Sequence, residues 1–153
     1  MFTEQLTQAL SIQGRIDPAQ QAAGTVTLSA GVDMQKFRRA TFILDVGVFG
    51  ASATVDMKLV EDTNSNLSTA TDVASDTSLT NVAITQLVAA GGNNRLATLE
   101  IRSDQAAKRY VGVKVTVGTA ATYLSVIGLG GEAVEKPGFL NDTAGVAQRL
   151  VAT

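Results

Sequence analysis

The sequence contains no cysteine, no histidine and no tryptophan among its 153 residues. Without cysteine the chain has no disulfide, no thiolate nucleophile and no Cys-based zinc site. Without histidine it has no imidazole base and no histidine metal ligand, so catalysis would have to rely on carboxylates or lysine. Aromatic residues make up only 5%, so the core must be packed mainly by valine, leucine, isoleucine and alanine.

Charge is nearly balanced, with 12 basic and 14 acidic residues. Recognition of nucleic acid or of an anionic membrane relies on clustered lysine and arginine, and the chain has no such stripe. No apolar run approaches the roughly 20 residues of a membrane helix, and the first residues lack the basic region of a signal peptide. We therefore expect a soluble protein made in the cytoplasm, with neither nucleic acid nor membrane as a partner.

Alternation of apolar and polar residues is the main pattern of the chain. In residues 53–62 the side chains of Val55, Met57 and Leu59 alternate with polar ones, which is typical of a strand with one dry and one wet face. Similar strands are predicted at 25–30, 37–48, 53–61, 77–90 (one broken strand), 95–102, 108–118 and 122–129. Strand 37–48 is apolar enough that we expect burial on both faces over part of its length. This spacing predicts an all-β fold: a single antiparallel β-sandwich, jelly-roll-like, or a small barrel.

Both ends of the chain depart from this pattern. Residues 1–23 are predicted to form an N-terminal arm with a short helix, because Phe2, Leu6 and Leu10 recur every four residues. A frayed terminus, or a helix that covers its own core, is an equal alternative. The sandwich is then expected at 24–131, followed by a C-terminal arm at 132–153.

Apolar residues in the two arms are the candidate assembly contacts, because a compact sandwich with an arm at each end is suited to assembly. They are Phe2, Leu6, Leu10, Ile16, Phe139, Leu140, Val146, Leu150 and Val151.

Catalysis by paired carboxylates, as in glycoside hydrolysis, has nominal candidates in Glu61 with Asp62 and in Asp72 with Asp76. Nothing in the sequence places either pair across a cleft, and the aromatic rings that would line a sugar site are scarce. We therefore predict that the protein is not an enzyme and carries no cofactor or metal.

The polar segment 62–76 begins with the first half of a calcium-loop pattern, Asp62-x-Asn64-x-Asn66. The glycine that such a loop requires is replaced by Leu67, and the closing glutamate is missing. We interpret the segment as a long loop whose turns are stabilised by Asx side chains and which is pinned by Leu67 and Val73.

Five segments, taken together and in this order, resemble small structural proteins of tailed bacteriophages that are encoded among the capsid genes. They are DMQKFRRATFILDVG (33–47), ATVDMKLVED (53–62), AITQL (83–87), KRYV (108–111) and LGG (129–131). The resemblance covers roughly residues 24–135. It implies a non-enzymatic virion protein made in the host cytoplasm, most specifically a cement or decoration protein. Such proteins bind the outside of the shell between major capsid subunits, and they are commonly β-rich and often trimeric.

The partners implied by this resemblance are the major capsid protein and further copies of the chain itself. A tail, connector or vertex component of the same phage is the alternative within the virion class. A glycan-binding β-sandwich is the alternative of another class and would need exposed aromatic rings, for which Tyr110 and Tyr123 are the only tyrosines. A bacterial surface or pilus subunit is a third alternative.

Overall fold

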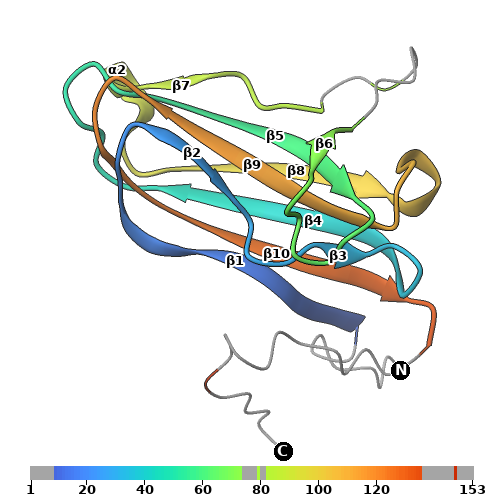
Figure 1. Ribbon diagram of the computed structural model, residues 1–153. Helices are drawn as coiled ribbons and strands as arrows, with labels where there is room; N and C mark the ends of the chain where they lie inside the picture. Colours follow the sequence, from blue (N-terminus) through green and yellow to red (C-terminus); the bar gives the residue numbers. More distant parts are fainter. Residues whose placement is uncertain (1–8, 74–78, 80–81, 136–146, 148–153) are drawn as a thin grey trace, which may run out of the picture.

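Two antiparallel sheets, packed face to face, form the part of the chain that the computed structural model describes, which is residues 9–73, 79, 82–135 and 147 (Figure 1). The four-stranded sheet has the order β1 (Leu10–Gln21), β10 (Thr122–Ala133), β4 (Phe37–Val46) and β8 (Arg95–Arg102). The second sheet has the order β2 (Gly24–Thr27), β9 (Tyr110–Gly118), β5 (Thr54–Asp62) and β6 (Thr71–Asp72). Short strands β3 (Val32–Asp33) and β7 (Leu87–Val88) add to β9 and β5. The predicted all-β sandwich is confirmed.

Two short helical turns lie between strands of the described part of the chain. The element α2 (Ala89–Gly92) is a turn with non-helical backbone at Ala90 and Gly91, and η1 (Ser103–Gln105) joins β8 to β9. Gly91 has a φ of 93° and Asn94 a φ of 55°, conformations that glycine and asparagine tolerate best. The turn predicted at Gly91–Asn94 is thus confirmed.

The core lies between the two sheets and is built by the alternation that the sequence displays. In β5, Val55 and Met57 are fully buried and Leu59 is 3% exposed, whereas the intervening side chains are half-buried. In β10, Gly130 leaves space for a neighbouring ring, because a Cβ atom at this position would lie 2.6 Å from Phe37. Strand β10 continues past the predicted end at residue 129 to Ala133.

Strand β1 corrects the predicted N-terminal arm. Residues Leu10–Gln21 belong to the sheet and pair with β10 (Figure 1). The period of two is hidden in the sequence because the register shifts twice, once between Ile12 and Gly14 and again between Ile16 and Ala19. Pro18 lies within the second shift, where its missing N–H costs no ladder bond. The predicted helix is therefore replaced by a strand over this range, while residues 1–8 lie outside the described residues.

Within the predicted strand at 77–90, the structure describes residues 79 and 82–90, and most of 82–90 is an irregular segment that runs beside β5. Among these described residues only Leu87–Val88 forms a regular strand, β7, although Ala83 bridges Lys58. The N–H of Ile84 donates to the Met57 carbonyl at 2.9 Å, and the N–H of Leu59 donates to the Val82 carbonyl at 2.8 Å. This edge of the second sheet is consequently covered by the chain itself.

Candidate docking surface

Three of the four nominal catalytic candidates, Glu61, Asp62 and Asp72, have structural roles, and the fourth, Asp76, lies outside the described residues. Glu61 is 2% exposed, and its carboxylate accepts hydrogen bonds from the backbone N–H of Ala107 at 2.8 Å and of Lys108 at 3.2 Å. It therefore fixes the connection that precedes β9. No group of three or more acidic side chains within the described residues is placed to hold a metal ion.

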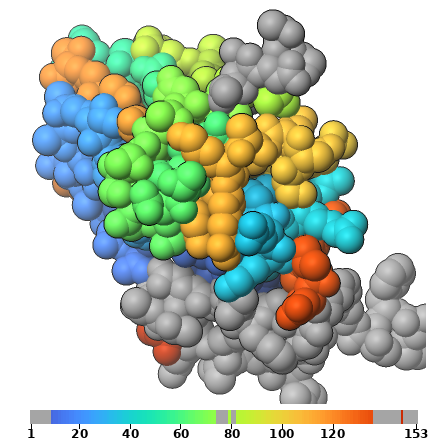
Figure 2. Space-filling view, turned by 45° about the vertical axis from the view of Figure 1, so that its right-hand side comes forward, coloured from blue at the N-terminus to red at the C-terminus, as the bar shows by residue number. Residues whose placement is uncertain are grey.

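Asp62 organises the polar loop that follows β5. Its carboxylate accepts hydrogen bonds from the N–H of Asn64 at 3.0 Å and from the N–H of Thr69 at 2.7 Å. Burial alone would raise the pKa of Asp62, but these bonds and that of the Thr69 hydroxyl lower it to about 2. Leu67 and Val73 are each 4% exposed and pin the loop to the core. The predicted Asx-stabilised, pinned loop is confirmed over the described residues 62–73, except that Thr71–Asp72 forms the short strand β6. Figure 2 shows its green residues directly beside the orange residues of β9.

Asp33 and Arg109 form the best-buried ion pair that the structure shows. The Arg109 Nε and Nη2 atoms donate to the two Asp33 carboxylate oxygens at 3.0 and 2.7 Å. Burial raises the pKa of Asp33, but hydrogen bonds from Arg109 and from the Gln35 N–H together hold it below its usual value. The guanidinium also lies 5.1 Å from the centre of the Tyr110 ring. This pair fixes β3 against β9.

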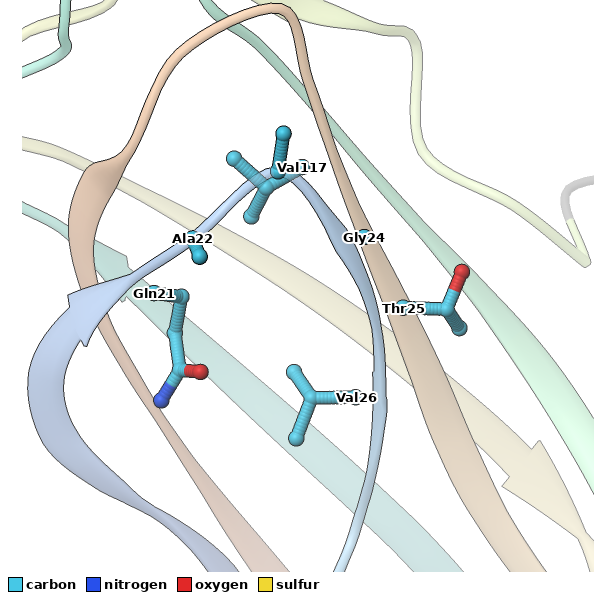
Figure 3. A pocket seen from close by; sticks show the side chains of 7 residues that line it. Gln21, Ala22, Gly24, Thr25, Val26 and Val117 are labelled. Carbon is cyan, nitrogen blue, oxygen red and sulfur yellow. The ribbon is translucent and has the colours of Figure 1, made fainter.

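A shallow hollow of about 220 Å³ lies at the turn between β1 and β2 (Figure 3). Gln21 and Val26 stand on opposite sides of it, and small residues such as Ala22 and Gly24 form the rest of its lining with Val117. No charged side chain lines it. The residues that line the hollow therefore include no ionisable group for acid–base chemistry.

The outer face of the second sheet is polar, and several of its groups are paired with one another. The hydroxyls of Thr25 and Thr116 are 3.2 Å apart, and Lys58 pairs with Asp72 at 2.8 Å. The Gln86 amide donates to a carboxylate on β5, Asp56, at 2.8 Å. The polar groups of such a face are satisfied by hydrogen bonds within the chain and by solvent water.

The outer face of the four-stranded sheet has the opposite character. Ile127 of β10 lies opposite Ile43 of β4 on this face, and Leu129 follows two residues later on the same side. The exposed fractions are 44% for Ile127, 52% for Tyr123 and 68% for Leu96. We call these five residues, Ile43, Leu96, Tyr123, Ile127 and Leu129, the apolar outer face. Ser125 and the exposed Asp45 lie among these residues on the same face, so the surface is mixed. Large apolar side chains gathered on one sheet face mark an interaction surface more often than scattered ones do.

Strand β4 is therefore buried on one face only, which corrects the expectation of burial on both faces. Phe42 and Leu44 are fully buried towards the core. Thr41 and Ile43 point the other way and are half-buried, and Asp45 is exposed. The apolar residues that favoured two-sided burial are in fact part of the apolar outer face.

Ion pairs flank the apolar outer face at one end. Arg39 of β4 donates to Glu100 of β8 at 2.7 Å and to Glu132 of β10 at 2.8 Å. The hydrogen bond with Glu100, followed by that with Glu132, raises the pKa of Arg39 above its ordinary value. Each of these charged groups has a partner within the chain, although one arginine facing two glutamates leaves a net negative charge at this rim. The arrangement matches the apolar centre and polar rim of protein interfaces.

The predicted assembly contacts are only partly placed by the structure. Ile16 lies in the core at 4% exposure, so it has no surface to offer a partner, which corrects its assignment as a contact. Leu10 lies in β1 opposite Gly131 and is half-buried. The other predicted contacts lie outside the described residues: Phe2, Leu6, Phe139, Leu140, Val146, Leu150 and Val151.

Sequence analysis missed the apolar outer face, although a signal for it was present. In 122–129, large apolar residues occupy both strand faces, since Leu124 and Val126 are buried while Ile127 and Leu129 face outwards. A strand that is apolar on both faces either lies in a central position or carries an interface. The order of the strands in the sheet decides between a central position and an interface. This order cannot be obtained directly from the sequence.

No protein-family model matches the chain, and no curated protein matches it. The structure is similar to the subunit of Bacillus endospore appendages, described as disulfide-linked pili, with 12% identity, a TM-score of 0.35, and coverage of 84% of this chain and 93% of that one. It is also similar to the infectious bursal disease virus Gx strain structure, with 11% identity, a TM-score of 0.42 and 84% coverage of this chain. Here the chain spans only 32% of the viral protein.

A third similar structure is the Israel acute paralysis virus pentamer, at 7% identity and a TM-score of 0.32, with coverage of 96% of this chain and 80% of that one. At such values the likeness gives no guide to function. In the described part of the chain no helix is long and apolar enough to cross a membrane.

Proposed function

We propose that this protein is a non-enzymatic structural protein of a tailed phage, a cement or decoration protein that binds the outer surface of the capsid. The observation that carries the proposal is the apolar outer face, a surface for docking on a sandwich whose other outer face is polar and satisfied. The order of the five resembling segments supports the phage assignment. The buried carboxylates Glu61 and Asp62 serve backbone contacts, which also favours a structural role.

The apolar outer face is assigned to the contact with the major capsid protein. Burial of a large aliphatic side chain contributes about 1.5–3 kcal/mol when complete, and Ile127, Tyr123 and Leu96 still expose about half of their surface or more. The charged groups at its rim already have partners, so docking does not strand an unpaired charge. The affinity of one copy for the capsid through this contact is modest. The avidity of many copies that bind together is high.

Stabilisation of the shell follows from mass action. A protein that binds the assembled shell, and not its dissociated subunits, shifts the equilibrium towards assembly. Oligomers that dock through several subunits gain roughly two to four orders of magnitude in avidity. The resemblance implies a trimer, and the two arms are proposed to reach neighbouring subunits.

The test is co-sedimentation of the purified protein with capsids that lack it. We expect Ile127→Asp to lower occupancy at least tenfold while the melting temperature stays close to that of the wild type, because the side chain faces solvent. The matched control is Thr25→Asp, an exposed position on the polar outer face of the second sheet. Equal occupancy for both variants and the wild type would overturn the assignment of this face.

Two further measurements separate the alternatives. Copy number per particle distinguishes a cement protein, present in hundreds of copies, from a tail, connector or vertex component, present in about six or twelve. A glycan-binding module would use Tyr123, which is exposed and lies on a sheet face. Ligand-dependent melting on a glycan panel, abolished by Tyr123→Ala, would replace the virion proposal with this alternative.

A further inference from the structure

The edges of the two sheets are protected to different degrees. Strand β1 carries Pro18 and two register shifts, and its Arg15 carbonyl accepts the Ser29 N–H at 3.0 Å. Strand β2 is four residues long, and the edge of β5 is covered by β6, β7 and the segment that includes Ala83. These are the usual devices by which proteins avoid pairing with other chains.

Strand β8 has none of these devices. It forms the other edge of the four-stranded sheet, and its eight residues, RLATLEIR, pair with β4 in one unbroken register. It contains no proline, glycine or lysine. An edge strand of this length, whose outward N–H and C=O groups have no strand partner among the described residues, is a template for strand addition.

The groups that point to this edge can be identified. The N–H of Arg102 donates to the Gln105 side-chain oxygen at 3.0 Å and so points away from β4. Because backbone groups alternate in direction along a strand, those of Leu96, Thr98 and Glu100 point to the same edge. Their side chains are exposed, and within the described residues β8 has β4 as its strand partner.

We propose that β8 pairs antiparallel with β8 of a second copy, around a two-fold axis at Thr98. Two copies of one strand can bond only between residues whose backbone groups face the edge, so the axis must pass through a residue. The N–H of Arg102 already donates to Gln105. The outward N–H groups that remain are those of Leu96, Thr98 and Glu100, and Thr98 is the middle one. Thr98 then lies opposite its own copy, and Leu96 lies opposite Glu100 of the second copy.

A second copy fits this edge better than an unrelated strand for reasons of charge. The register places no like charges directly opposite each other, and Glu100 keeps its ion pair with Arg39 in each copy. The result is an eight-stranded sheet in which the outer faces of the two four-stranded sheets lie on the same side. This pairing does not rest on the capsid proposal, and it departs from the trimer that the family resemblance implies.

Sedimentation equilibrium of the full chain over a range of concentrations tests the pairing. We expect a monomer–dimer equilibrium for the wild type and for Thr98→Ala, which keeps the N–H. Thr98→Pro removes only the outward N–H, and both hydrogen bonds at the axis are lost with it, so dimerisation should weaken roughly thirtyfold. A monomeric or trimeric wild type, or an unchanged dimer in the proline variant, would overturn the proposal.

Cysteine cross-linking gives a second test that does not depend on the folding of the proline variant. The chain has no cysteine of its own, so a single introduced thiol reports one contact. Thr98→Cys should form an interchain disulfide on mild oxidation. The Cα atoms of two residues that face each other in a hydrogen-bonded antiparallel pair are about 5.5 Å apart, which is within the range that a disulfide can bridge. The control, Thr25→Cys, is also exposed and should remain reduced under the same conditions. Equal cross-linking of both variants, or none at Thr98, refutes the two-fold axis even if capsid binding is intact.

Discussion

Replacement of Gly130 by alanine should destabilise the protein, because β10 at this point leaves no room for a side chain. A Cβ atom would lie 2.6, 2.7 and 2.8 Å from three ring carbons of Phe37, well inside the optimal carbon–carbon separation. Phe37 is 1% exposed and is held within β4, next to β10. The ring therefore has no route into solvent, and either the ring or the strand must shift.

The size of the effect follows from two opposing contributions. Overpacking of a core costs about 1–3 kcal/mol, and alanine recovers about 0.4–1 kcal/mol by restricting the unfolded chain. We expect a net loss of about 1–2 kcal/mol. In a protein of 153 residues this lowers the melting temperature by roughly 2–8 °C.

The neighbouring glycine provides the control. A Cβ atom at Gly131 would lie 3.3 Å from the flexible end of Leu10 and 3.9 Å from the Cβ atom of Arg39, so Gly131→Ala should melt within about 2 °C of the wild type. Combining Gly130→Ala with Phe37→Leu should cost less than the sum of the two changes, measured by urea unfolding as a double-mutant cycle. Equal melting of the two alanine variants, or strict additivity in the cycle, would refute the steric argument.

Three other positions give independent predictions. Hydrogen bonds lower the pKa of Asp62 from 3.8 to about 2, so its contribution to stability is complete above pH 3.8 and is lost as the pH falls through 2. Asp62→Asn should show a weaker pH dependence of its urea midpoint in that window, and identical profiles would contradict this. Thr119 is a β-branched residue with a φ of 67°, so Thr119→Gly should raise the free energy of unfolding by about 0.5–1 kcal/mol, which a lower urea midpoint would disprove. Arg109→Met should lower the free energy of unfolding, and by less than the loss of a fully buried pair would, because the arginine side chain is 42% exposed. It should also raise the pKa of Asp33 in a carboxyl NMR titration, and an unchanged pKa would exclude the ion pair.

Most strands could be predicted from the sequence because their pairing is regular. Strands β5, β8 and β9 alternate between more buried and more exposed residues over most of their length, with interruptions at Val60–Asp62 and at Gly112, and their observed ranges agree with the predicted ones within two residues. The polar loop was also predictable, since Asp and Asn side chains bond to backbone within their own segment. Such features depend on residues that are close together in the sequence, so they can be predicted from it.

The misassigned features depend on pairing between distant segments. Strand β1 was missed because two register shifts erase the alternation, and the spacing of Leu6 and Leu10 imitates a helix. The apolar outer face arises because β10 and β4 are neighbours, so that Ile127 and Ile43 meet. Neither the pairing partner of a strand nor its place in the sheet can be obtained from the alternation of its residues.

The position of β10 has a consequence for how the chain folds. This last described strand is inserted between β1 and β4, so β1 has no ladder partner on that side until residues 122–133 have been synthesised. Contacts between such distant segments slow folding, and the four-stranded sheet cannot close on a nascent chain that still lacks its C-terminal part. Chains interrupted before β10 would present open strand edges, which are prone to aggregation. Each copy must therefore complete its sheet after synthesis, and only then can it present an intact surface for assembly.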